Sequence, residues 1–253
     1  MTIRWLEGIR VVLYRRNEMS RELFVTGYYE PNQLYFLDQV LKAGNVFVDV
    51  GANMGLYSLF AANRVGVHGY IIAIEPSTRD FERLETNVKL NSFRNIKPEH
   101  CALSNHAGFA ELHIAKERNA GHNTFGTFAY EGVRQERTEH VRLKTLDEMI
   151  QQKRLERIDV IKVDVEGSEL SVLEGAENTI NKFHPILLLE LSDMTLAPQG
   201  CTSSQVWRFL TGKGYTIFEY DGKTGHPVAA ELKQRYESEN IIAVYNPSAS
   251  SVS

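Results

Sequence analysis

Residues 46–55 read Val-Phe-Val-Asp-Val-Gly-Ala-Asn-Met-Gly, and this stretch decides the fold. The valine-rich run is typical of a strand that is buried on both faces of a parallel sheet. It ends in Asp49, Gly51 and Gly55, and residues 56–63 then follow a helical pattern. This order predicts a nucleotide-sized corner, because glycine lets backbone approach a ligand and free N–H groups at a helix start favour negative charge.

The spacing of the glycines limits the classes of ligand that this turn could bind. A dinucleotide site needs Gly-x-Gly-x-x-Gly, but Asn53 and Leu56 stand at its second and third glycine positions. A side chain would meet the pyrophosphate there, so a nicotinamide cofactor is disfavoured. No Gly-Lys-Ser/Thr follows a glycine-rich turn, which argues against a P-loop. Asp-x-Gly-x-x-x-Gly instead resembles the first motif of the S-adenosylmethionine-dependent methyltransferases, whose ligand offers a carboxylate and an ammonium to such a turn.

Composition bounds the class of protein. A chain of 253 residues with 43% hydrophobic residues can form one large domain with a full core. The net charge of −4 provides no basic field for nucleic acid, and no apolar run approaches the roughly 18 residues of a membrane span. Only Cys101 and Cys201 are present, and we expect two reduced thiols. We therefore expect a cytoplasmic enzyme without a nucleic-acid or membrane partner, and its oligomeric state stays open.

Strands and helices alternate along the chain. After residues 46–50, apolar strands are predicted at 70–75, 96–102, 159–163, 185–191, 216–220 and 241–245, with helices at about 78–91, 169–181 and 203–212. This alternation predicts right-handed crossovers and a parallel sheet. The stretch between the last two strands is polar and has only a short helical candidate at 229–236, so those two strands could pair antiparallel.

An acid ends the second strand of this alternation. Glu75 lies 20 residues after Gly55, where an acid can accept hydrogen bonds from both ribose hydroxyls. Asn53 could reach the methionine portion of the ligand, Tyr57 could cover it, and Ala102-Leu103-Ser104 form a loop where the adenine should lie. The alternatives are a solvated acid, an asparagine that shapes the turn and a tyrosine that packs in the core.

A second informative stretch, residues 161–169, reads Ile-Lys-Val-Asp-Val-Glu-Gly-Ser-Glu. Strand alternation places Lys162 and Asp164 on the same face, and Glu166 lies in the turn beyond the strand. Open α/β sheets bind ligands at this carboxyl edge, which predicts an active site. The alternative is a structural salt bridge between Lys162 and Asp164, although a charge pair in an apolar strand is costly to bury unless it is well matched.

Four spans together, residues 49–55, 75–76, 143–147 and 162–169, resemble the FkbM family of methyltransferases in order and spacing. The Lys-x-Asp-x-Glu-Gly element is the specific part, and the resemblance covers roughly residues 30–245. It implies a Rossmann-like class I methyltransferase fold, in which a seven-stranded, mostly parallel sheet carries helices on both faces and ends in an antiparallel strand. It also implies S-adenosylmethionine as cofactor, usually methyl transfer to a hydroxyl oxygen, and a position for Glu30 near the cofactor. For Glu30 a plain loop acid is the alternative.

The resemblance also divides the chain. Residues 1–44 are expected to form an N-terminal segment that packs on the cofactor and substrate side, and residues 45–247 the methyltransferase domain. Within this domain, residues 105–144 are predicted to be an insertion at the carboxyl edge of the sheet, with half-exposed strands at its two ends. The serine-rich tail, residues 248–253, is predicted to be disordered.

An alcohol is a poor nucleophile, so a base near the acceptor oxygen should help by about 10²–10⁴-fold. The candidates are Asp164, Glu166, Glu190 and His122, and Lys162 could position Asp164 or the acceptor. His122 has the most suitable ordinary pKa, about 6.5, although a histidine in a polar loop often faces solvent. The three acids could also bind a divalent ion. Metal is not favoured, because the Asp-Asn pair of the metal-dependent catechol-type enzymes is missing at the expected strand end.

The leading hypothesis is an S-adenosylmethionine-dependent O-methyltransferase that acts on a hydroxyl of a small molecule, such as a sugar, polyketide or peptide-type metabolite of secondary metabolism. Methylation of a nitrogen or a carboxylate, a cofactor-binding scaffold without turnover, and a nicotinamide oxidoreductase remain as alternatives. The acceptor pocket would be built by residues 116–138, the N-terminal segment and residues 195–201, which carry no recognisable chemistry.

Overall fold

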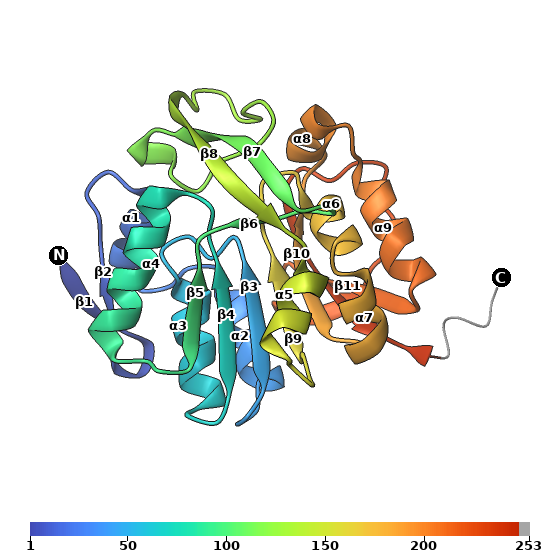
Figure 1. Ribbon diagram of the computed structural model, residues 1–253, viewed down its shortest axis with the longest axis horizontal. Helices are drawn as coiled ribbons and strands as arrows, with labels where there is room; N and C mark the ends of the chain where they lie inside the picture. The colour runs from blue at the N-terminus through green and yellow to red at the C-terminus, as the bar shows by residue number, and fades with distance from the viewer. Residues whose placement is uncertain (248–253) are drawn as a thin grey trace.

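A computed structural model of the protein describes residues 1–247, and the predicted disordered tail lies outside these residues. An eight-stranded sheet in the order β12-β11-β13-β10-β9-β3-β4-β5 forms its centre (Figure 1). In chain order these strands are β3 (Val46–Val50), β4 (Tyr70–Ile74), β5 (Ile96–Glu99), β9 (Val160–Val163), β10 (Ile186–Leu191), β11 (Tyr215–Tyr220), β12 (Pro227–Ala229) and β13 (Glu239–Tyr245).

The pairing of the strands confirms the predicted α/β class. Strands β5, β4, β3, β9 and β10 run parallel to one another, and β13 is antiparallel to both β10 and β11. These seven strands are the ones expected, with the antiparallel strand last. The short β12 adds an eighth, paired antiparallel with β11 at the edge of the sheet.

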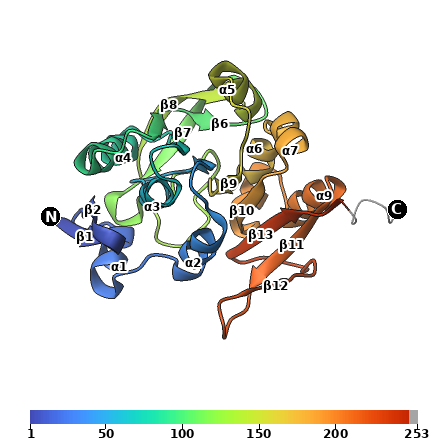
Figure 2. The same ribbon diagram turned by 90° about the horizontal axis from the view of Figure 1, so that it is seen from below.

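Helices cover both faces of the sheet, as Figure 2 shows. One face packs on α2 (Pro31–Val40), α3 (Leu56–Val65) and α4 (Thr78–Asn91); the other packs on α5 (Leu146–Lys153), α6 (Glu169–Glu174), α7 (Glu177–Phe183) and α9 (Ser203–Gly212). Because the central strands are covered twice, all five residues of β3 are buried. Asp49 and Lys162 are the polar exceptions inside these apolar strands, and they stand opposite each other in the register of β3 and β9.

Two expected elements differ in the structure. The helix predicted at 169–181 is divided into α6 and α7 at Gly175, whose backbone lies against the backbone oxygen of Ser104. The helical candidate at 229–236 is wrong, because β12 occupies its start and Tyr236 is then held by tertiary contacts: its N–H donates to Asp193 Oδ2 at 2.8 Å. Both misses come from long-range contacts that the local pattern does not encode.

Two smaller sheets flank the central one. The predicted strand at 96–102 is split, and its end becomes β6 (Ala102–Leu103), which pairs with β8 (Gln135–Lys144) and, through it, with β7 (Gly108–Ala115). This β6-β8-β7 sheet carries most of the expected insertion and lies across one end of the central strands (Figure 1). The remaining α8 (Asp193–Leu196) and the short 3₁₀ helices η2 (Glu117–Asn119) and η3 (Ala197–Gln199) lie in the loops.

The N-terminal segment packs on the same side as α3 and α4. It consists of the hairpin β1 (Thr2–Trp5) and β2 (Ile9–Val12), the 3₁₀ turn η1 (Leu6–Gly8), α1 (Glu18–Thr26) and α2. The N–H of Val12 donates to Asn87 Oδ1 of α4 at 2.9 Å, which ties the hairpin to the domain. Among residues 1–247, no helix is long and apolar enough to cross a membrane.

The two informative stretches of the sequence meet backbone to backbone. Gly51 follows β3 with φ +82°, and a Cβ built on it would lie 1.8 Å from the backbone oxygen of Asp164 at the end of β9. The glycine is therefore required by space as well as by conformation. This contact brings the carboxyl ends of the two strands together.

We predict that Gly51→Ala destabilises the protein far more than Gly44→Ala. Gly44 has nearly the same φ, +83°, but a Cβ there would meet nothing within 4 Å, so its variant reports the conformational cost alone. That cost is about 1–2 kcal/mol, and the clash at residue 51 should add about 1–3 kcal/mol. Urea unfolding of both variants measures the difference, and equal destabilisation would show that the strand ends do not constrain each other.

Candidate functional site

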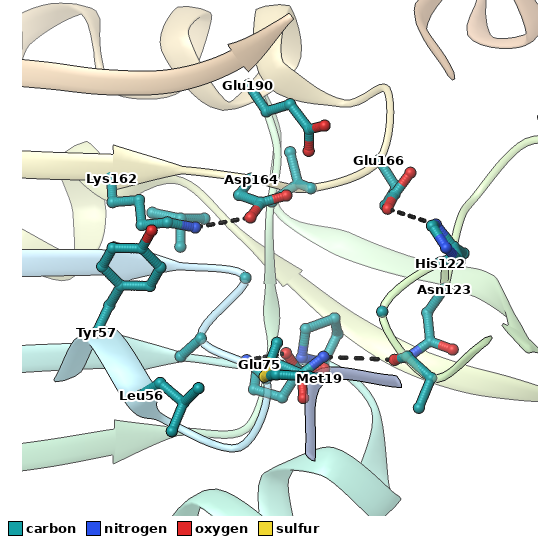
Figure 3. A pocket seen from close by; sticks show the side chains of 18 of the residues that line it. Met19, Leu56, Tyr57, Glu75, His122, Asn123, Lys162, Asp164, Glu166 and Glu190 are labelled. Atoms are coloured by element: carbon teal, nitrogen blue, oxygen red, sulfur yellow. Dashed lines mark hydrogen bonds and ion pairs between the residues drawn. The ribbon is translucent and has the colours of Figure 1, made fainter. Parts of the chain in front are cut away.

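A cleft of about 400 Å³ lies at the carboxyl ends of β3, β4, β9 and β10, within the size range of small-molecule sites (Figure 3). The central strands and the turns that follow them supply Val50, Gly51, Ala52, Asn53, Leu56, Tyr57, Ile74, Glu75, Pro76, Lys162, Asp164, Val165, Glu166, Ser168, Glu190 and Ser238. The N-terminal segment and the inserted sheet supply Asn17, Glu18, Met19, Glu22, Tyr29, Glu30, Ala102, Leu103, Ala120, Gly121, His122, Asn123, Phe125 and Tyr130.

Most of the residues predicted from the sequence line this one cleft. They are Glu30, Gly51, Asn53, Tyr57, Glu75, Ala102, Leu103, His122, Lys162, Asp164, Glu166 and Glu190. These residues come from strand ends, a helix, the N-terminal segment and the insertion, so the fold assembles them from distant parts of the chain. Asp49, Gly55 and Ser104, which we expected to contact the ligand, do not line it.

Each of these three residues has a structural contact instead. Asp49 is fully buried, and its Oδ2 accepts a hydrogen bond from Ser58 Oγ of α3 at 2.6 Å. Gly55 begins α3, where a Cβ would lie 2.5 Å from the side chain of Leu84. The N–H of Ser104 donates to the backbone oxygen of Lys144 at 2.9 Å, which joins it to the β6-β8 pairing.

The turn after β3 also differs from our expectation, because its N–H groups are not free. The N–H groups of Gly51 and Ala52 both donate to Ile74 O. The N–H of Asn53 donates to Glu75 Oε2, that of Met54 to Asn53 Oδ1, and that of Gly55 to Ala52 O. All five distances are 2.8–3.0 Å. The turn is therefore satisfied by the protein itself. The polar recognition in this cleft depends on side chains.

Glu75 is held in place by the turn that it faces. Its two carboxylate oxygens accept the N–H groups of Asn53 and Ser77, both at 2.9 Å. Each oxygen keeps a further lone pair, so the carboxylate can still accept from a ligand. Burial raises the pKa of Glu75 to about 8, with Asp80 adding to the rise, while the two N–H groups act in the opposite direction.

Lys162 is the one lysine or arginine in the lining of the cleft. It is 3% exposed, and its Nζ lies 2.7 Å from Asp164 Oδ2 and 4.6 Å from the centre of the Tyr57 ring. Burial lowers its pKa, but the charges of Asp164, Asp49 and Glu30 outweigh burial, and the pKa is raised well above its usual value. Lys162 therefore stays charged. It neutralises acids from three parts of the chain.

Glu30 of the N-terminal segment is bound to the domain close to Lys162. Glu30 is placed by hydrogen bonds from Tyr57 Oη at 2.6 Å and from Asn240 Nδ2 at 3.1 Å. Burial raises the pKa of the Glu30 carboxyl and Lys162 lowers it, with a net rise. Glu30 thus links α2, α3 and β13 at one end of the cleft.

Asp164 and Glu190 form a carboxyl pair on neighbouring strands (Figure 3). Burial raises the pKa of Asp164, but Lys162 outweighs it, so the pKa of Asp164 is lowered. Burial and the Asp164 charge raise the pKa of Glu190 to about 9. Glu190 is therefore protonated near neutral pH. Its carboxyl faces Asp164 in Figure 3 and accepts a hydrogen bond from Ser238 Oγ.

A second polar pair, His122 and Glu166, lies on the side of the insertion. His122 Nδ1 is 3.0 Å from Glu166 Oε1, and the His122 side chain is 30% exposed (Figure 3). Burial lowers the pKa of His122, but the hydrogen bond and charge of Glu166 outweigh it, so the pKa is raised. Because Nδ1 is engaged, Nε2 is the nitrogen left to meet another molecule.

Sequence reasoning expected the N-terminal segment at the cleft, but it did not identify the residues of α1 and of the turn before it. Asn17, Glu18, Met19 and Glu22 line the cleft although they lie far along the chain from either motif. Asn17 caps α1 by accepting from the N–H of Ser20 at 2.8 Å, and this capping signal predicts a helix start but not its partner. Within residues 1–247, no group of three or more His, Cys, Asp or Glu is arranged to hold a metal ion.

The sequence is similar to those of known methyltransferases. Residues 49–217 match the methyltransferase FkbM domain family. The chain is 29% identical over 209 residues to the methyltransferase sdnD of Sordaria araneosa, covering 70% of this chain and 76% of that protein. It is 26% identical over 164 residues to the hexuronic acid methyltransferase AglP of Haloferax volcanii, covering 63% of this chain and 61% of that protein.

A solved structure is similar in fold. The crystal structure of methyltransferase FkbM from Methylobacillus flagellatus superposes with a TM-score of 0.51 at 18% identity, covering 84% of this chain. The matched region is 47% of that chain, so this protein spans about half its length. At this identity the likeness concerns the fold alone.

We predict that Lys162→Met lowers the free energy of unfolding by about 3–5 kcal/mol at pH 7, because buried carboxylates lose their cation. Without Lys162, the folded-state pKa values of Asp164, Asp49 and Glu30 rise, so the folded state takes up protons. An acid whose pKa is higher in the folded state than in the unfolded state favours folding at low pH. This contribution to the free energy of unfolding is lost as the pH rises through the folded-state pKa. The deficit of the variant should therefore be smaller at pH 5 than at pH 8.

Urea unfolding at both pH values measures this deficit. Lys89→Met is the control, because Lys89 forms an exposed pair with Glu85 at 3.1 Å and should change stability by at most about 1 kcal/mol. A Lys162 variant that is as stable as the control, or equally affected at both pH values, would contradict the charge balance described here.

Proposed function

The chain belongs to the FkbM family of S-adenosylmethionine-dependent methyltransferases, and from this premise we propose that it methylates a hydroxyl oxygen of a small molecule. The observation that carries the proposal is the His122–Glu166 pair, which stands in a cleft whose other charged groups are almost all acids. A histidine paired with a carboxylate can take a proton from an alcohol at neutral pH.

The residues of the cleft fit S-adenosylmethionine. When bound, this cofactor supplies an electrophilic methyl group on a sulfonium centre. Glu75 has lone pairs for the ribose hydroxyls, and Ala102 and Leu103 present apolar surface for the adenine. Even with Glu75 and Glu190 protonated near neutral pH, five other acids in the lining outnumber Lys162, which suits a ligand with a net positive charge: Glu18, Glu22, Glu30, Asp164 and Glu166.

The same excess of acids supports a neutral acceptor group. A carboxylate acceptor would meet like charges at Glu166 and Asp164 with Lys162 already paired, whereas a hydroxyl carries no charge before it reacts. AglP is named a hexuronic acid methyltransferase, and such an acid offers hydroxyls as well as a carboxylate. For this chain the charges favour the hydroxyls. A small acceptor also agrees with the size of the cleft and with the net charge of −4, which provides no surface for nucleic acid.

In this proposal, His122 and Glu166 have different roles in proton transfer. His122 accepts the hydroxyl proton at Nε2 as the oxygen attacks, and the Glu166 carboxylate stabilises the imidazolium through Nδ1. The Asp164–Lys162 pair lines another part of the cleft. The aromatic side chains Phe125 and Tyr130 also line it and help to exclude water. Holding the acceptor oxygen in line with the donor is the larger part of the task.

The proposal is tested by assaying a panel of matched acceptors that carry a hydroxyl, an amine or a carboxylate on the same scaffold, with isotopically labelled S-adenosylmethionine. NMR of the products identifies the methylated atom. Methyl transfer to oxygen of a hydroxyl supports the proposal. Transfer to nitrogen or to a carboxylate, or tight cofactor binding without transfer to any acceptor, would replace it with one of the alternatives.

We predict that His122→Asn lowers kcat by about 10²–10⁴-fold while the Kd for S-adenosylmethionine changes little, because only the proton acceptor is removed. His106→Asn is the matched control, since His106 is exposed and its ring contacts Asn105 outside the cleft. Turnover and calorimetry of both variants measure the effect. Wild-type kcat in the His122 variant would remove this residue from the mechanism.

The pH profile of kcat tests the role of Glu166. Activity requires neutral His122, so kcat should fall as pH decreases through its pKa, which Glu166 raises above the ordinary value. Glu166→Gln should lower this pKa, so the acid limb of the profile moves to lower pH while the plateau also falls. An acid limb that stays in the same place would contradict the pairing.

A further inference from the structure

Glu169, the first residue of α6, is a buried acid without a cation. It is 2% exposed, and no lysine, arginine or histidine among residues 1–247 pairs with it. Its Oε1 accepts the backbone N–H groups of Val165 and Gly167, at 3.3 and 3.2 Å, and its Oε2 is buried without a hydrogen-bond partner. Burial raises its pKa to about 7, against the effect of these N–H groups. A buried carboxyl in this state is costly, so its position calls for a reason.

The turn that Glu169 binds is in an uncommon conformation. Glu166 has φ +52° and Gly167 has φ +104°, so two successive residues lie outside the usual region, and the first of them is not glycine. A left-handed non-glycine residue costs about 1–2 kcal/mol and persists only where its surroundings hold it. The two N–H groups that Glu169 binds are those on either side of Glu166.

Other groups hold the opposite side of the same turn. The backbone oxygen of Glu166 accepts hydrogen bonds from Thr124 Oγ1 at 3.1 Å and from Gln199 Nε2 at 2.9 Å. These contacts restrain the carbonyl, and Glu169 restrains the N–H groups. Together they set the direction in which the side chain of Glu166 leaves the backbone, which is towards His122 (Figure 3).

We propose that Glu169 is a positioning residue that holds Glu166 in this left-handed conformation and thereby maintains its hydrogen bond to His122. The proposal rests on the proposed function for its catalytic meaning, but the contact itself is measurable without turnover. A carboxyl oxygen can accept two N–H groups of one turn at once. Glutamine retains such an oxygen, whereas alanine retains none.

A competing explanation is that Glu169 only stabilises α6, since an acid at a helix N-terminus is favourable. The two explanations differ at His122, which a purely structural role would leave unchanged. Glu174 at the other end of α6 provides a matched control, because it is exposed and bonds Asn105 outside the cleft. Glu174→Ala should alter the helix without altering the turn.

The test is an NMR titration of the His122 ring in the whole protein, with His122→Asn used to assign its signal. Glu166→Gln should lower the pKa of His122 by about 1 or more. Glu169→Ala should reproduce most of that decrease, Glu169→Gln should largely restore the wild-type value, and Glu174→Ala should match wild type. If the alanine variant does not fold, Glu169→Asp replaces it, because the shorter side chain withdraws the oxygen from the turn.

A wild-type titration in the Glu169→Ala or Glu169→Asp variant would overturn the proposal and leave a structural role. An unchanged titration in Glu166→Gln would overturn it as well, since the pair itself would be absent. Failure of the proposed function has a different signature: His122→Asn would keep full turnover while the titrations still shifted. If the proposed function of His122 holds, Glu169→Ala should lower kcat by about 10–100-fold with little change in the Kd of the cofactor.

Discussion

One buried ammonium, Lys162, lies where four segments of the chain meet. It pairs with Asp164 on its own strand, stands opposite Asp49 in the sheet register, and lies over the ring of Tyr57, whose hydroxyl binds Glu30 of the N-terminal segment. A nearby cation lowers the cost of burying carboxylates, so this charge favours the gathering of acids at the carboxyl edge of an apolar sheet. The cleft proposed for the cofactor owes its acidic lining to that concentration.

The cleft has two ends with different chemistry. At the end of β4, Glu75 is fixed by two N–H groups and keeps lone pairs for a ligand. At the other end, Asp164 and Glu190 lie near Lys162, and His122 of the insertion pairs with Glu166 of the turn after β9. Between them, the close contact of Gly51 with the backbone of Asp164 joins the ends of β3 and β9. Backbone packing therefore determines where the side-chain chemistry is placed.

Local sequence was sufficient for the positions of the central strands along the chain and for most of the residues that line the cleft, because strand ends meet at one edge of a parallel sheet. It was insufficient where a polar group could either face the cleft or form a hydrogen bond within the protein. Asp49 turns to Ser58 on α3, and the turn N–H groups find protein acceptors, so neither is presented to the cleft. Tertiary contacts also determine the pairing in the β6-β8-β7 sheet, the residues that α1 adds to the cleft, and the hydrogen bonds of Glu169 to its turn. The alternation at both ends of the insertion predicts strands there, and the structure has β7 and β8, but no pattern in the sequence indicates how they pair or what α1 and Glu169 contact.

The central claim is that the donor lies along this cleft, between the end of β4 and the His122–Glu166 pair. A crystal structure of the protein with S-adenosylhomocysteine tests it most directly. The account predicts that the ribose hydroxyls bind Glu75 and that the sulfur faces the space between Asp164 and His122. An empty cleft with the ligand bound elsewhere, or a sulfur that points away from this space, would contradict it.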